Sequence, residues 1–141
     1  MTDTTKELTT LSTGTSELES LLETPNQVKR PPCVILCHPH PQYGGNMFDG
    51  LINQISSYLL SNEIATLRFN QRGVGMSSGE SGDGTNEMID TEAVVNLISS
   101  NPKIDGSRLG IIGYSFGAWM ALESSLRTNL IKSLVSIACP Q

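Results

Sequence analysis

The sequence has no apolar run near the roughly 18 residues that a bilayer crossing needs, and it is poor in basic residues. Lys and Arg number 9 against 14 Asp and Glu, a formal net charge of −5, which argues against non-specific attraction to nucleic acid or anionic lipid. Residues 1–24 lack the basic start and apolar core of a signal peptide. We therefore expect a cytoplasmic protein without nucleic-acid or membrane partners, acting on small molecules or on other proteins.

Cysteine is scarce as well, with three residues in the chain. Cys33 and Cys37 lie in one expected strand, about 13 Å apart at ~3.3 Å per residue, which is too far for a disulfide and fits a reducing compartment. The segment "CVILCHPH" also offers thiol and imidazole ligands for zinc. Strand alternation, however, sends Cys37 and His38 to opposite faces. We expect no metal ion in this protein.

The apolar patterns predict one domain in which strands and helices alternate. Two short strands near residues 8–12 and 17–22 flank the turn "TGTS". The uninterrupted apolar run "CVILC" is typical of a strand covered on both faces. "LINQISSYLL" has helical spacing and "EIATLRFN" has strand alternation, with Ala65, Leu67 and Phe69 on one side and Thr66, Arg68 and Asn70 on the other.

The second half of the chain continues this order. We expect a helix capped by Thr85, with Ile89, Ala93 and Leu97 sharing a face. A strand at "LGIIG", a helix over 116–126 and a strand at "SLVSIAC" follow. The alternation predicts an α/β fold with a mostly parallel sheet, right-handed crossovers and helices on both faces.

A serine between two glycines stands where a strand meets a helix, in "GIIGYSFGAWMAL" at residues 110–122. On such a turn the Ser115 hydroxyl projects from the carboxyl end of the sheet. Backbone then approaches backbone so closely that positions 113 and 117 must be very small. Gly113 and Gly117 occupy them. A G-x-S-x-G pentapeptide also arises by chance as a simple turn, but the strand before it and the helix after it favour a nucleophile elbow.

Two backbone N–H groups are candidates for an oxyanion hole beside Ser115. The following helix places the N–H of Phe116 and the positive end of its dipole next to the serine. The second donor is expected from "HPHPQYGG", where Pro39 and Pro41 have no N–H and leave His40 as the only donor between them. The alternative is that these histidines are solvent-facing loop residues that serve rigidity or packing.

The segment "RFNQRGVGMSSGE" offers an alternative function, because Gly73-Val74-Gly75 after a strand resembles a dinucleotide fingerprint. A serine stands at the third glycine position, and the loop runs on instead of opening a helix. The chain also has no Gly-Lys-Ser/Thr of a phosphate-binding loop. We expect no cofactor.

Three motifs in one order, "VILCHPHPQYGGNM", "LRFNQRGVGMSSG" and "LGIIGYSFGAWMAL", resemble the α/β-hydrolase superfamily and its HPHP-type branch of small serine hydrolases. Members of this branch are dienelactone-hydrolase-like, serine-aminopeptidase-like or dipeptidyl-peptidase-like. The resemblance covers about residues 5–141 and implies an α/β-hydrolase fold. It also implies Ser115 as nucleophile, the N–H groups of Phe116 and His40 as oxyanion hole, and a carboxylic ester, thioester or related acyl bond as substrate. Arg72 receives no catalytic role from it.

The triad of this superfamily follows the order serine, acid, histidine, and the chain departs from it. After Ser115 the only acidic residue is Glu123, inside the next helix, and no histidine follows. Three hypotheses remain open. The first is a single but incomplete α/β-hydrolase domain over residues 1–141, without its last strands, acid and base. The second is a catalytically silent module for binding or assembly, with self-association along the open edge of the last strand. The third is an active short enzyme with an unusual base, His38, His40 or one from a partner chain.

Overall fold

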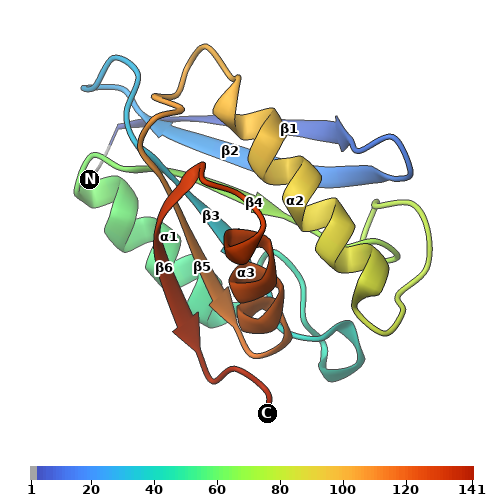
Figure 1. The fold of residues 1–141 in the computed structure, drawn as a ribbon. Coiled ribbons are helices and arrows are strands. Elements are labelled where there is room, and N and C mark those ends of the chain that lie inside the picture. Colours follow the sequence, from blue (N-terminus) through green and yellow to red (C-terminus); the bar gives the residue numbers. More distant parts are fainter. Residues whose placement is uncertain (1–2) are drawn as a thin grey trace.

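The computed structural model describes residues 3–141, in which six strands form one mixed sheet (Figure 1). The strands are β1 (Thr4–Ser12), β2 (Glu17–Pro25), β3 (Cys33–Cys37), β4 (Ala65–Phe69), β5 (Leu109–Tyr114) and β6 (Ile131–Ile137). The helices are α1 (Gly50–Ser61), α2 (Thr85–Ser99) and α3 (Phe116–Leu126), with a short 3₁₀ helix at Pro41–Tyr43.

The strand order across the sheet is β1-β2-β4-β3-β5-β6. Parallel pairing joins β4, β3, β5 and β6, while β1 and β2 form an antiparallel hairpin that pairs with β4. Helices α2 and α3 lie on one face of the sheet, and α1 covers the other (Figure 1). The expected α/β fold with a mostly parallel sheet and helices on both faces is confirmed.

Strand β4 shows how the sequence pattern sorts side chains between the two faces. Leu67 and Phe69 lie in the apolar core together with residues of α2 and α3. Thr66 and Arg68 point to the opposite face, where Thr66 shares a hydrogen bond of 2.7 Å with Ser56 of α1. Burying a large apolar side chain contributes about 1.5–3 kcal/mol, so this alternation fixes which face receives α2 and α3.

Helix α2 differs from the expectation at its start and in the face that it buries. Gly84 takes the cap position and Thr85 is the first helical residue, so the predicted Thr85 cap is wrong. Gly84 has a φ of 107°, and a Cβ there would lie 2.5 Å from the ring of Trp119. Ile89 and Leu97 share a face, as their spacing indicates, but this face is turned to solvent: Ile89 is 47% exposed and Leu97 is 41% exposed. The helix buries Glu87, Asp90, Thr91, Val94, Val95 and Ile98 instead.

Strand β6 is the last strand in the sheet order, and most of its residues are exposed. It pairs with β5 along one edge, and its other edge pairs with no strand of residues 3–141. Leu134 and Val135 are 36% and 47% exposed, respectively. The free backbone N–H and C=O groups of this edge are available for pairing with another chain.

Candidate active site

Ser115 lies on the turn between β5 and α3, with a φ of 57° and a ψ of −118°. A positive φ is unfavourable for a residue with a Cβ, so the surrounding contacts must hold this conformation. The Ser115 N–H donates to the carbonyl of Ile137, the last residue of β6 (2.8 Å). The Ser115 carbonyl accepts from the N–H of Ala118 (2.9 Å). The backbone thus forms a strained strand-to-helix turn that is pinned from both sides.

The two glycines of the turn are where α3 comes closest to the sheet. A Cβ at Gly113 would lie 2.1 Å from the carbonyl oxygen of Gly117. A Cβ at Gly117 would lie 2.1 Å from the carbonyl oxygen of Cys37, in β3. Both distances are far below van der Waals contact and involve backbone that cannot move independently. Any side chain at either position would push α3 away from β3 and β5.

The structure brings Ser115, Phe116 and His40 to one cavity of about 270 Å³ at the carboxyl ends of the parallel strands. Phe116 opens α3, so its N–H has no partner within the helix. The N–H of His40 lies between two prolines, just before the 3₁₀ helix. Within residues 3–141 neither N–H donates a hydrogen bond. Two unused backbone donors therefore belong to residues that line the same cavity as the serine.

His38 is a buried bridge between two loops. Its Nε2 accepts from the N–H of Gln71 (3.0 Å), so the ring proton belongs on Nδ1, which lies 2.6 Å from the carbonyl oxygen of Pro39. Burial lowers the pKa of His38, which favours this neutral form. Both ring nitrogens are used in holding the loop after β3 against the loop after β4.

His40 has only one ring nitrogen free. Its Nδ1 accepts from the N–H of Gln42 (3.1 Å), which assigns the proton of the neutral ring to Nε2. A general base for Ser115 needs a free acceptor nitrogen. In each histidine the nitrogen that can accept already accepts a backbone N–H, and the other nitrogen carries the ring proton. Neither ring therefore has a free acceptor nitrogen. The hypothesis of a base within this chain therefore finds no support in its two histidines.

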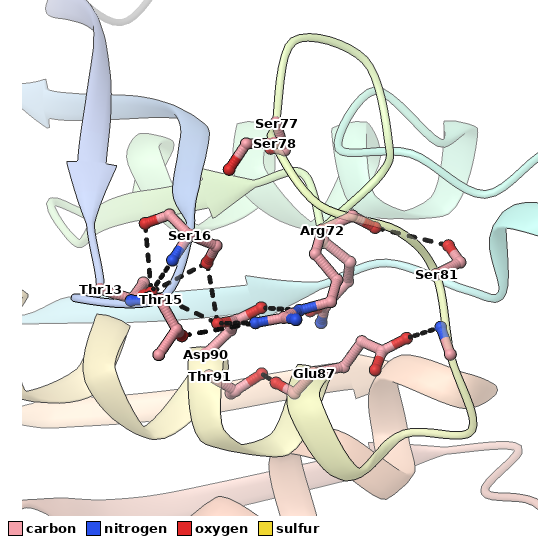
Figure 2. A network of polar contacts seen from close by, with 12 residues as sticks. Thr13, Thr15, Ser16, Arg72, Ser77, Ser78, Ser81, Glu87, Asp90 and Thr91 are labelled. Atoms are coloured by element: carbon pink, nitrogen blue, oxygen red, sulfur yellow. Dashed lines mark hydrogen bonds and ion pairs between the residues drawn. The ribbon is translucent and has the colours of Figure 1, made fainter.

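The glycine-rich loop after β4 is held by an ion pair between Arg72, which is half-buried, and the buried carboxylate of Asp90 (Figure 2). Arg72 donates to both carboxylate oxygens of Asp90 in α2, at 2.7 and 2.9 Å. Asp90 also accepts from the hydroxyl of Ser16, in the turn between β1 and β2 (2.9 Å). One turn earlier in α2, Glu87 accepts from the N–H of Gly82 (2.8 Å). Arg72 thus has a structural partner, and α2 anchors the segment that reaches the cavity.

Glu19 and Asn70 hold the other side of this loop. The amide of Asn70 donates to Glu19 (2.9 Å), and the same carboxylate oxygen accepts from the N–H of Met76 (2.7 Å). Asn70 also accepts from the N–H of Met47 (2.8 Å), which ties the loop after β3 to the loop after β4. The Gly73–Gly75 segment folds as a turn, and the next helix starts only at Thr85.

Sequence reasoning missed four side chains that line the cavity beside Ser115. They are Tyr43 at the end of the 3₁₀ helix, Asp83 before α2, Trp119 on the first turn of α3 and Pro140 after β6. No local motif marks them, because they come from four separate segments. Trp119 occupies the position four residues after Ser115, and this helical spacing was the one available signal.

The two buried cysteines do not line this cavity. Cys33 and Cys37 are fully buried, and burial raises the pKa of each thiol to about 12. Among residues 3–141 no three His, Cys, Asp or Glu side chains are grouped so that they could hold a metal ion. Within the same residues no helix is long and apolar enough to cross a membrane.

A mostly parallel sheet with a serine on a strained strand-to-helix turn at its carboxyl edge defines an α/β-hydrolase fold. The chain belongs to the dienelactone hydrolase family, whose profile matches residues 66–137. The recognition of this superfamily from the three motifs is therefore confirmed.

Similar proteins agree with this assignment. An uncharacterised protein of Rickettsia prowazekii, RP471, is 36% identical over 109 residues, which are 77% of this chain and 45% of that protein. The crystal structure of ATU1826 from Agrobacterium tumefaciens, an α/β-hydrolase of unknown function, matches with a TM-score of 0.85 and 32% identity over 94% of this chain and 60% of that one. An α/β serine hydrolase homologue from Coxiella burnetii matches with a TM-score of 0.84 and 29% identity, over 99% of this chain and 64% of that one. The chain thus spans about half to two thirds of the length of these relatives.

Proposed function

We propose that this chain carries the nucleophile half of a serine hydrolase that cleaves a carboxylic ester, thioester or related acyl bond through an acyl-enzyme on Ser115. The observation that supports this most directly is the common cavity of Ser115 and the two unused N–H groups of Phe116 and His40. A simple turn would have no need for the strained backbone of Ser115 or for glycines at the closest approach of α3.

In the proposed reaction the Ser115 oxygen attacks the acyl carbon while its proton passes to a base. The carbonyl oxygen becomes an oxyanion that accepts from the Phe116 and His40 N–H groups, at the positive end of the α3 dipole. The tetrahedral intermediate then expels the alcohol or thiol, and water later releases the acid from the serine. Because neither histidine has a free acceptor nitrogen, we place the acid and base of the triad outside this chain.

The test is acylation of Ser115. With p-nitrophenyl acetate, this chain should release p-nitrophenol slowly, because loss of triad members leaves a residual rate of only about 10³ to 10⁴-fold over water. Intact-mass spectrometry should detect an added acetyl group, and peptide mapping should place it on Ser115. Ser115→Ala should abolish both signals. An unchanged rate in Ser115→Ala would remove Ser115 from the reaction.

One observation favours the second candidate, a silent binding or assembly module that self-associates along an edge strand. The outer edge of β6 is unpaired within residues 3–141 and carries the partly exposed Leu134 and Val135. Light scattering during gel filtration should then give a discrete dimer, and Val135→Lys should return it to a monomer. A monomer in the unmodified chain would contradict this alternative.

A further inference from the structure

The cavity beside Ser115 combines aromatic walls with one carboxylate. Phe116 and Trp119 form an edge-to-face pair with ring centroids 5.8 Å apart. The ring of His40 lies between Phe116 and Tyr43, at 4.8 and 6.1 Å from them. Asp83, two residues before α2, is the acidic residue of this lining.

The carboxylate of Asp83 is charged and has no cationic partner. It accepts a hydrogen bond from the N–H of Thr85 (3.0 Å), and this bond lowers the pKa of the Asp83 carboxyl. Within residues 3–141 no Lys, Arg or His lies within ion-pair distance of it. Two other acidic residues, Glu87 and Asp90, lie close by in α2, but both are buried. Glu87 accepts a hydrogen bond from the N–H of Gly82, and Asp90 accepts from Arg72. Asp83 is thus the acidic group available to a ligand in this cavity.

The aromatic rings favour the same kind of ligand as the carboxylate does. The face of a tryptophan or tyrosine ring attracts a cation through the ring quadrupole, and tryptophan does so most strongly. Trp119 lines the cavity on the first turn of α3, close to the serine in sequence, and Tyr43 lines it from the loop after β3. A positively charged group would therefore find two such aromatic rings and a carboxylate in one cavity.

We propose that this cavity selects acyl substrates that carry an ammonium group, with Asp83 as the specificity-determining residue and Trp119 as the ring that contacts the cation. This inference rests on the proposed function, because it assigns the substrate class of the Ser115 site. An anionic substrate would meet the Asp83 charge and be disfavoured, and a neutral one would gain nothing from it.

The experiment uses the intrinsic fluorescence of Trp119, the single tryptophan of the chain. The probes are acetylcholine and its neutral isostere 3,3-dimethylbutyl acetate, titrated into Ser115→Ala so that neither ester is consumed. We expect acetylcholine to bind about 5-fold more tightly than the neutral ester, because aromatic rings and an exposed carboxylate each contribute a modest attraction to a cation. Asp83→Asn, which keeps an oxygen for the Thr85 N–H, should reduce this preference to about 2-fold and leave the affinity for the neutral ester unchanged.

Asp105→Asn is the matched control. Asp105 also accepts from a backbone N–H two residues on, that of Ser107 (3.0 Å), but it is half-buried, pairs with Arg108 (2.7 Å) and does not line the cavity. This variant changes the net charge equally and should keep the full preference for acetylcholine. Equal affinities for the two esters, equal behaviour of the two aspartate variants, or no fluorescence response to either ester would overturn the inference. If the preference holds while hydrolysis does not depend on Ser115, the proposed function fails and the cation site stands.

Discussion

The role of the His40 N–H in acyl transfer can be tested by a substitution that removes only this donor. His40 has a φ of −61°, which is the value that a proline ring imposes, so His40→Pro deletes the N–H without requiring a new backbone φ. His40→Ala is the matched control, because it removes the imidazole and its hydrogen bond from Gln42 but keeps the N–H. The two variants differ in the one group that the proposal uses.

The size of the effect follows from the number of donors. The proposed oxyanion hole has two backbone donors, from His40 and Phe116, and removal of one donor typically costs about 10² to 10³-fold, or roughly 2.7–4 kcal/mol of transition-state stabilisation. Loss of the hydrogen bond between His40 Nδ1 and the N–H of Gln42 costs about 0.5–1.5 kcal/mol of stability, equally in both variants.

The assay is Ser115-dependent release of p-nitrophenol from p-nitrophenyl acetate, with Ser115→Ala as the baseline. We expect His40→Ala to keep most of the unmodified rate and His40→Pro to fall close to the baseline. Urea denaturation of both variants establishes that they are equally folded. Equal rates in the two folded variants would refute the assignment of the His40 N–H to the oxyanion hole.

Three further predictions concern stability. Gly117→Ala should lower the free energy of unfolding, measured by urea denaturation, by about 3 kcal/mol or more, because its Cβ would lie 2.1 Å from the Cys37 carbonyl oxygen. Gly50→Ala is the control and should change this free energy little, because a Cβ at Gly50 would have no atom within 4 Å. Equal effects of the two substitutions would contradict the argument from close approach. Asp90→Asn should cost about 1.5–3 kcal/mol because it removes the charge of the buried carboxylate that accepts two hydrogen bonds from Arg72. A loss no larger than that of an exposed aspartate variant would count against this role. Burial lowers the pKa of His38 in the folded protein. Below about pH 6.5 the unfolded chain therefore binds a proton at this residue that the folded chain does not, and the free energy of unfolding should fall as the pH decreases. In His38→Gln the plot of this free energy against pH should have a smaller slope. A wild-type slope retained in that variant would mean that other groups cause the pH dependence.

The order of strands and helices could be predicted because it depends on local patterns. The apolar run at residues 33–37, the alternation in β4 and the helical spacing in α1 each follow from whether side chains recur every two or every three to four residues. The elbow was predictable for the same reason, since its glycines, serine and flanking elements are contiguous in the chain. The start of α2 was not, because Gly84 is required by its contact with Trp119, a residue far along the chain.

What the sequence alone determined, then, is the class of fold, the position of Ser115 and the two residues whose N–H groups are candidates for the oxyanion hole. The tertiary structure decided how the remaining polar residues are used. It pairs Arg72 with Asp90, engages both ring nitrogens of His38 between two loops, and places Asp83 and Trp119 in the cavity of Ser115. These contacts join segments separated by many residues, and a local pattern carries no information about which distant polar groups will satisfy one another once they are buried.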